Sequence, residues 1–201
     1  MIGVYGAAGC GRGIMPVARV NFPNDELVFV DDGSHPESVN GHRCLSREEF
    51  LAADPKGVIL AIADGHTRAR INAQLGLPLM GVHSDDAVLM DEVELGPGAC
   101  LSPFVCITSN VKVGLCLHAN LYSYIEHDCV IGDFVTLGPG AKVNGNVTVE
   151  DFAYIGAGAV IRQGLTIGKG AIVGMGAVVT KDVPPGQTVI GNPARPMLGK
   201  I

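Results

Sequence analysis

The chain has 201 residues, of which 14 are Lys or Arg and 20 are Asp or Glu, and its formal net charge is −6. The basic residues are scattered and form no stripe, which argues against a nucleic-acid partner. No uninterrupted run of roughly 18 apolar residues is present, which argues against a membrane span. Glycine is abundant, with 28 residues, and tryptophan is absent, a composition that favours many tight turns.

The six cysteines contain no C-x-x-C pair and lie mostly among aliphatic residues. Reduced thiols in a cytoplasmic protein have this distribution. The six histidines show no spacing typical of zinc ligands. We therefore expect a cytoplasmic location and no metal site.

The first part of the chain alternates between predicted strands and helices. Strands are expected at residues 2–5, 27–31, 57–63 and 78–82, and helices near 12–21 and at 46–53 and 65–75. This alternation is typical of a small Rossmann-like βαβ domain with a parallel sheet. We place this domain at residues 1–82.

A glycine turn, Gly6-Ala-Ala-Gly9-Cys10-Gly11, follows the first predicted strand and enters a helix, where backbone N–H groups can hold a phosphate. Asp31 and Asp32 end the second strand and are candidates to accept ribose hydroxyls. The spacing G-x-x-G-x-G differs from the dinucleotide motif G-x-G-x-x-G, so a mononucleotide fits better than NAD. A tight turn without a ligand is the alternative.

The third predicted helix adds a further candidate to this substrate site. Arg68 lies near its start, after the loop that contains Ala63, and is a candidate for a phosphate contact. A solvated charge on the helix is the alternative interpretation of Arg68.

A six-residue repeat occupies most of the remaining sequence. From Leu89 to Pro184 the chain divides into sixteen consecutive hexapeptides, whose first residue is Leu, Ile or Val except at Ala119 and whose fifth residue is always small or aliphatic. A helix turns about 100° per residue, so this period would leave no consistent buried face. In strands, each fifth residue and the next first residue face the same way. We therefore predict one short strand and one corner per hexapeptide.

Three such hexapeptides close a triangular coil, and stacked coils about 4.8 Å apart form an all-β parallel β-helix. The first and fifth side chains are expected to fill its axis. Glycine often occupies the second position, where we expect the corner to need a positive φ. These glycines are Gly96, Gly114, Gly132, Gly138, Gly156, Gly168 and Gly174. The β-helix domain, with a C-terminal cap, is placed at residues 83–201.

His127 stands at a predicted corner, between Glu126 and Asp128, and is expected to face solvent. A neutral imidazole oriented by a neighbouring carboxylate is the arrangement of a general base. Gly145 lies one coil further on, and we expect its backbone N–H to be free for an oxyanion. Asn120, on the preceding corner, is an additional polar candidate. A solvated turn residue is the alternative for His127.

These motifs together resemble the hexapeptide-repeat sugar acyltransferases, which include bacterial sialic acid O-acetyltransferases and the N-acetyltransferases of nucleotide-linked 4-amino-4,6-dideoxy sugars. The resemblance spans nearly the whole chain. It rests on Gly6 to Gly11, Asp31-Asp32, Asn120 with residues 125–132, Gly145-Asn146, and the ending Gly191-Asn-Pro-Ala-Arg195.

The resemblance implies a left-handed β-helix, a homotrimer and active sites built from two subunits. It implies that His127 is the base, that Asp128 tunes it and that the Gly145 amide supports the thioester oxygen. It further implies that the N-terminal domain holds the nucleotide and that acetyl-CoA, the co-substrate, lies between neighbouring β-helices. The implied cofactor-binding residues are Asn120, Thr136, Gly145, Ala157, Gly174, Met175, Gly176 and Pro193.

Two positions depart from the family pattern. Cys10 stands where many relatives carry a histidine, and Thr136 stands where some relatives use a histidine near acetyl-CoA. These departures leave the identity of the sugar open.

Three functions are compatible with the sequence. The first is acetyl-CoA-dependent N-acetylation of a nucleotide-linked amino sugar for surface polysaccharide or glycan biosynthesis, because a domain of mononucleotide-binding size precedes the β-helix. The second is O-acetylation of a free sugar such as sialic acid. The third is a non-catalytic solenoid scaffold.

Overall fold

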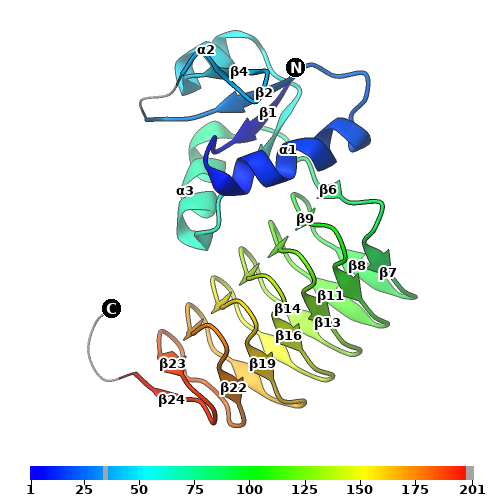
Figure 1. Cartoon of the computed structure of the whole chain (residues 1–201), viewed down its shortest axis with the longest axis vertical. Coiled ribbons are helices and arrows are strands. Elements are labelled where there is room, and N and C mark those ends of the chain that lie inside the picture. The colour runs from blue at the N-terminus through cyan, green and yellow to red at the C-terminus, as the bar shows by residue number, and fades with distance from the viewer. Residues whose placement is uncertain (34–35, 198–201) are drawn as a thin grey trace.

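The computed structural model describes residues 1–33 and 36–197. An N-terminal α/β domain sits on a triangular β-solenoid, and the chain passes from the first to the second near residue 82 (Figure 1). Among the described residues, no helix is long and apolar enough to cross a membrane.

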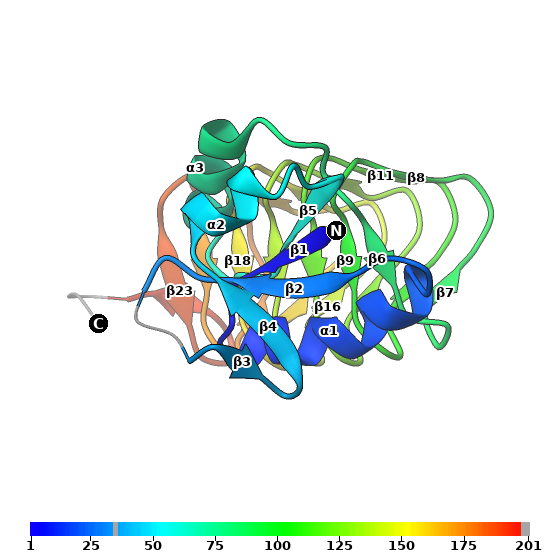
Figure 2. The same ribbon diagram turned by 90° about the horizontal axis from the view of Figure 1, so that it is seen from above.

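A five-stranded sheet in the order β3-β4-β2-β1-β5 forms the centre of the N-terminal domain. Its strands are β1 (Ile2–Tyr5), β2 (Leu27–Val30), β3 (Ser38–Val39), β4 (His42–Leu45) and β5 (Gly57–Leu60), all parallel except β3. The helices are α1 (Gly9–Asn21), α2 (Arg47–Ala52) and α3 (Gly65–Leu75). Helix α1 packs on one face of the sheet, and α2 and α3 pack together on the other (Figure 2). All residues of β1, β2 and β5 are buried, as expected for a parallel sheet covered on both faces.

The solenoid has three parallel sheets, one for each face of its triangular section. The first face holds β7 (Val88–Leu89), β10 (Cys106–Ile107), β13 (Tyr124–Ile125), β16 (Lys142–Val143), β19 (Val160–Ile161) and β22 (Val178–Val179). The second holds β8 (Val93–Leu95), β11 (Val111–Val113), β14 (Val130–Ile131), β17 (Thr148–Val149) and β20 (Thr166–Ile167). The third holds β6 (Val82–His83), β9 (Cys100–Leu101), β12 (His118–Ala119), β15 (Thr136–Leu137), β18 (Tyr154–Ile155), β21 (Ile172–Val173), β23 (Thr188–Ile190) and β24 (Arg195–Pro196), with β24 antiparallel to β23.

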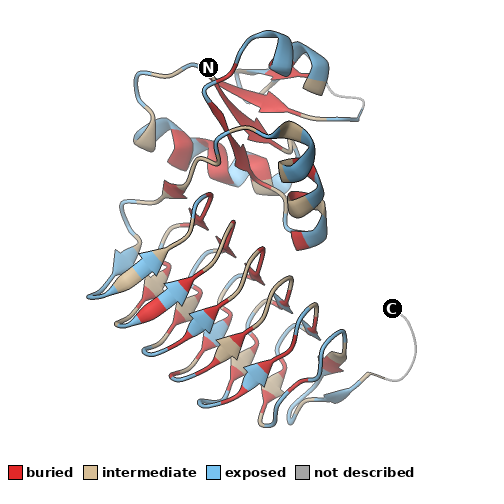
Figure 3. Cartoon of the chain, turned by 180° about the vertical axis from the view of Figure 1, so that it is seen from behind, coloured by how far each residue is buried: buried red, intermediate tan, exposed pale blue. Residues whose placement is uncertain are grey.

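The solenoid axis is filled by the first and fifth residues of the hexapeptides, as the repeat predicts. The first positions are almost fully buried from Leu101 to Val179, and the fifth positions from Ala99 to Val183 (Figure 3). The first hexapeptides lie at the end of the stack, where Leu89 is 41% exposed. Each fully buried aliphatic side chain contributes roughly 1.5–3 kcal/mol, so the ladder holds the stack together without large aromatic residues.

The prediction that the second-position glycines supply positive φ is wrong. Positive φ falls at the fourth position, including Phe104, Asn110, Tyr122 and Asp128, with φ between 58° and 63°. The second-position glycines instead allow close approach of the next coil. A Cβ on Gly132, for example, would lie 2.6 Å from the backbone nitrogen of Asp151.

The predicted strand at 78–82 also differs from the structure. It contributes a single bridge, between Leu79 and Val58, to the N-terminal sheet. Val82 and His83 form β6 and pair with β9 in the third face of the solenoid. The chain therefore enters the solenoid about one strand earlier than the helix-and-strand alternation predicts.

Candidate functional site

His127 is presented on an edge of the solenoid, as predicted. We call this the His127 edge; it joins the first face to the second and includes residues 126–128 and 144–146. The imidazole side chain is 55% exposed, and its Nδ1 lies 2.7 Å from Oδ2 of Asp128. Because a carboxylate only accepts hydrogen bonds, Nδ1 carries the proton and donates it, which leaves Nε2 free to accept another.

Asp128 is held from both sides. Its backbone has a φ of 58°, and its Oδ1 accepts a 3.2 Å hydrogen bond from the side-chain amide of Asn110, one coil earlier. The hydrogen bond from His127 and the one from Asn110 lower the pKa of Asp128 below its ordinary value. The carboxylate therefore stays ionised and can stabilise an imidazolium beside it.

Gly145 lies directly against the imidazole, because a Cβ on this residue would be 2.6 Å from both Cε1 and Nε2 of His127. The expectation of a free Gly145 amide is not met, however. Its N–H donates a 3.0 Å hydrogen bond to Oε2 of Glu126. Glu126 precedes the histidine, and its side chain reaches up to the amide of the next coil.

A hollow of about 520 Å³ lies beside the glycine turn in the N-terminal domain. Gly6 has a φ of 106°, and a Cβ on Gly11 would be 1.7 Å from the Gly6 carbonyl oxygen, so helix α1 starts against the end of β1. Asp31 lines this hollow and accepts hydrogen bonds from the amides of Ala7 and Gly33. Its other lining residues are Ala7, Ala8, Arg12, Pro36, Ser38, Val39 and Asn40.

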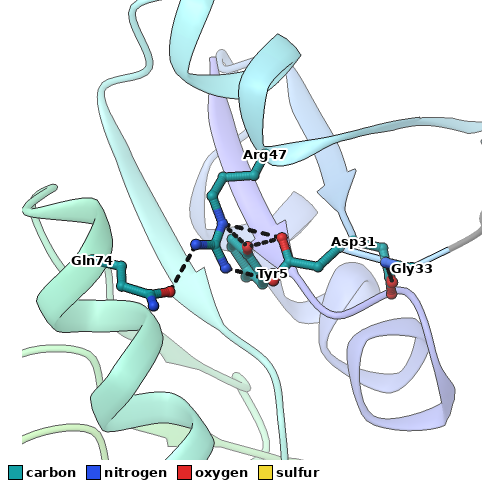
Figure 4. Close-up of polar contacts among 6 residues, drawn as sticks. Tyr5, Asp31, Gly33, Arg47 and Gln74 are labelled. Atoms are coloured by element: carbon teal, nitrogen blue, oxygen red, sulfur yellow. Dashed lines mark hydrogen bonds and ion pairs between the residues drawn. The ribbon is translucent and has the colours of Figure 1, made fainter.

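Asp32 does not line this hollow, contrary to its predicted role beside Asp31. The Asp32 carboxylate accepts hydrogen bonds from the Tyr5 hydroxyl and from Arg47. Arg47 also donates a hydrogen bond to Gln74 of α3 (Figure 4). Partial burial alone would raise the pKa of Asp32, but the bonds from Tyr5 and Arg47 outweigh it and lower the pKa.

Cys10 lies at a second hollow, of about 370 Å³, between α1 and the solenoid. Its Sγ is 3.6 Å from Nε2 of His118, and burial raises the thiol pKa to about 11, so the thiol is protonated. His118 is 2% exposed, and burial, together with the charge of Arg68, lowers its pKa to about 4. This hollow also includes Gly9 and Asn120, so Asn120 faces the glycine turn.

Arg68 is neither a phosphate contact nor a solvated charge, because it is 1% exposed. Its guanidinium donates hydrogen bonds to the carbonyl oxygens of Ile62, Ala63, Phe134 and Val135 and to the hydroxyl of Thr136. The Thr136 hydroxyl in turn donates to the Ala63 carbonyl. Arg68, Ala63 and Thr136 therefore join the two domains. Ala63 and Thr136 also line a hollow of about 390 Å³ between the start of α3 and the solenoid, so their roles in binding substrate and acetyl-CoA stay predictions.

Most of the remaining residues that the resemblance assigns to the cofactor lie on a different edge from His127. We call it the Asn120 edge; it joins the third face to the first and includes residues 120–122, 156–158 and 174–176. Ala157 and Gly174 to Gly176 lie on it, and Met175 is 80% exposed. Pro193 follows β23 at the end of the stack. One chain therefore carries the two halves of the expected acyl site on separate edges.

The sequence did not predict the positions that four residues occupy at the site: Arg12, Asn110, Glu126 and His118. Arg12 lines the 520 Å³ hollow from the first turn of α1, where a basic residue after the glycine turn is a detectable signal. Asn110 stands 18 residues before Asp128, a spacing that the repeat itself supplies. The hydrogen bond from the Gly145 amide to Glu126 and the burial of His118 depend on three-dimensional contacts without a sequence signal.

Known proteins with similar sequences and structures point to one family. Residues 146–181 match the family described as bacterial transferase hexapeptide (six repeats). The chain is 46% identical over 212 residues to the GDP-perosamine N-acetyltransferase of Escherichia coli O157:H7, covering 98% of this chain and 96% of that relative.

Two solved structures are similar along nearly their whole length. WeeI from Acinetobacter baumannii AYE is 51% identical, with a TM-score of 0.94 over 98% of this chain and 99% of that chain. PerB from Caulobacter crescentus, solved in complex with CoA and GDP-perosamine, is 26% identical, with a TM-score of 0.87 over 98% and 96%. The predicted family is thus confirmed: the chain belongs to the bacterial hexapeptide-repeat sugar acyltransferases.

Proposed function

We propose that this chain transfers the acetyl group of acetyl-CoA to the amino group of a nucleotide-linked 4-amino-4,6-dideoxy sugar, with GDP-perosamine as the substrate. The observation that carries the proposal is the His127–Asp128 pair, whose exposed Nε2 stands over Gly145 in a chain of this family. The similarity to enzymes named for GDP-perosamine supports the choice of sugar nucleotide.

The chemistry follows from the tautomer of His127. Nε2 accepts the proton of the amine as its nitrogen attacks the thioester carbonyl carbon, and Asp128 stabilises the imidazolium that forms. When the carbon–sulfur bond breaks, the imidazolium returns the proton to the departing thiolate. The amide of Gly145 donates to the oxygen on which negative charge develops.

We assign the nucleotide to the domain at residues 1–82 and acyl transfer to the solenoid at residues 83–201, wound in the left-handed sense of the hexapeptide family. The hollow beside the glycine turn supports this division, because Arg12 and the start of α1 supply a cation and backbone N–H groups for the diphosphate. Six free thiols agree with a cytoplasmic location, where the acetylated sugar would enter surface polysaccharide synthesis.

The assembly that fits these sites is a homotrimer, in which the His127 edge of one subunit meets the Asn120 edge of the next. The Asn120 edge exposes apolar side chains that a neighbour can cover. Phe104 and Tyr122 are 50% and 63% exposed and stack with ring centroids 4.9 Å apart. Acetyl-CoA would lie between the two edges, near Ala157 and the segment from Gly174 to Gly176.

Thiol release from acetyl-CoA tests the reaction. The purified chain is incubated with GDP-perosamine, with UDP- and dTDP-linked 4-amino sugars and with free sialic acid. We expect fastest release with GDP-perosamine. Faster release with sialic acid would identify an O-acetyltransferase, and no release with any acceptor would favour the scaffold.

Co-expression of two inactive variants tests the shared site. His127→Ala removes the base, and Ala157→Trp blocks the Asn120 edge. If each site uses both edges from different subunits, mixed oligomers regain a fraction of the activity, because one interface then carries two intact edges. Mixed oligomers without activity would contradict a two-subunit site.

A further inference from the structure

The Gly145 amide has an acceptor of its own in this chain. Its N–H donates to Oε2 of Glu126 at 3.0 Å, and the same glycine packs against the His127 ring. A backbone amide has one hydrogen, so this carboxylate occupies the position that the thioester oxygen requires. The Glu126 carboxylate and the thioester oxygen cannot both accept from the Gly145 amide, because the first carries negative charge and the second develops it.

A second bond of this kind shows what the contact does elsewhere in the fold. Glu150 accepts a 2.7 Å hydrogen bond from the backbone amide of Lys169, and both pairs are 19 residues apart, from the second hexapeptide position to the third position one coil later. A glutamate at this position therefore caps an otherwise unpaired corner amide. The Glu150 pair lies on another edge, which joins the second face to the third, away from His127.

We propose that Glu126 is a displaceable occupant of the oxyanion position, holding the Gly145 amide in the free protein and leaving it when the acyl group of acetyl-CoA binds. This inference rests on the proposed function. It makes Glu126 a positioning residue that acts through Gly145. Its side chain is only partly buried, so it can swing away into solvent.

If Glu126 must leave the Gly145 amide, its departure weakens the binding of the acyl thioester but not the binding of the rest of the coenzyme. Free CoA lacks the carbonyl oxygen and has no need of the Gly145 amide. Removing the carboxylate should therefore tighten acetyl-CoA and leave CoA unchanged. Loss of one hydrogen bond to a charged acceptor in a partly exposed place corresponds to a change of about 3- to 10-fold in the Kd for acetyl-CoA.

Calorimetric titration of Glu126→Ala and Glu126→Gln with acetyl-CoA and with CoA tests this. We expect the Kd for acetyl-CoA to fall about 3- to 10-fold in Glu126→Ala, and less in Glu126→Gln, whose neutral amide oxygen still accepts but more weakly. The Kd for CoA should not change. In turnover, the KM for acetyl-CoA should fall in parallel.

Glu150→Ala is the matched control, since it removes the same type of bond away from His127 and should leave both Kd values unchanged. The proposal is overturned if Glu126→Ala binds acetyl-CoA no more tightly, or if both ligands change equally. Thermal unfolding identifies a variant that fails to fold, and Glu126→Gln then decides. Failure of the wild type to bind acetyl-CoA would instead contradict the proposed function.

Discussion

The imidazole of His127 rests on the backbone of Gly145, 18 residues later, so closely that a Cβ there would lie 2.6 Å from Nε2. The backbone does not require glycine at this position, because φ is not positive. The corresponding position of neighbouring coils holds Ser109, Gln163 and Lys181. The glycine therefore makes room for the ring.

Gly145→Ala should displace the imidazole without unfolding the protein. A shift of about 1 Å in a catalytic group costs on the order of 10²-fold in rate. We expect kcat for acetyl transfer to fall by that order, while the thermal midpoint stays near that of the wild type. Gln163→Ala, at the same position one coil further, is the control and should keep full activity. Unchanged turnover in Gly145→Ala would show that the ring is not placed by this contact.

Asn110 should position the base through Asp128. Asn110→Gly removes its hydrogen bond but keeps the left-handed backbone, whose φ is 59°. We expect a fall of about 5-fold in kcat, the equivalent of one hydrogen bond, with little change in KM.

The variant Asn110→Asp tests the electrostatic part of this role. It places a second negative charge beside Asp128, which favours the protonated imidazole. The acid limb of the pH–rate profile should therefore move to higher pH. An identical profile in this variant would mean that Asn110 has a structural role only.

Arg12 should contribute to binding of the nucleotide. It lies on the first turn of α1, lines the 520 Å³ hollow and faces the glycine turn, with Nη1 3.4 Å from the Ala7 carbonyl oxygen. Arg12→Gln should raise the KM for the sugar nucleotide about 10-fold, because a charge-assisted contact to the diphosphate is lost. Arg19→Gln, exposed on the last turn of the same helix, should have no effect. Equal effects of the two variants would place the nucleotide elsewhere.

His118 should make the stability of the fold depend on pH. Burial lowers its pKa to about 4, whereas in the unfolded chain it titrates near 6.5. As the pH falls from 6.5 to 4, the unfolded chain takes up a proton that the folded chain does not. The free energy of unfolding therefore decreases, by roughly 3 kcal/mol once the pH lies below the pKa of His118 in both the unfolded and the folded chain.

Thermal unfolding of wild type and His118→Asn between pH 7 and pH 4 measures this effect. The difference between the two proteins isolates His118 from the other titrating groups. The variant should be less stable at pH 7 but lose less stability on acidification. Parallel curves would show that His118 becomes protonated in the folded state without cost.

The repeat made the solenoid predictable, because a period of six residues is incompatible with a helix and fixes which side chains point inward. The location of His127 and Asp128 on an edge follows from the same register. Positive φ could not be located in this way, since Phe104, Tyr122 and Asp128 adopt it in place of glycine. The stacked coils stabilise this conformation, which their residue types alone do not predict.

The polar contacts around the site were harder to predict, because they join residues that are distant in sequence. Arg68 looks like a surface charge on its helix, yet it is buried against carbonyl groups of residues 134 and 135. Asp31 and Asp32 are adjacent aspartates just after β2, but only Asp31 lines the 520 Å³ hollow, whereas Asp32 accepts hydrogen bonds from Tyr5 and Arg47. The bond between Glu126 and Gly145 arises only when one coil is stacked on the next.

In the proposed reaction, His127 removes the proton of the acceptor amine. Thiol release by His127→Asn with saturating acetyl-CoA and GDP-perosamine, combined with the Kd for acetyl-CoA, tests it most directly. We expect a fall of about 10²- to 10⁴-fold in kcat with the Kd changed less than about 3-fold. Turnover within a few-fold of the wild type, with acetyl-CoA bound normally, would contradict it.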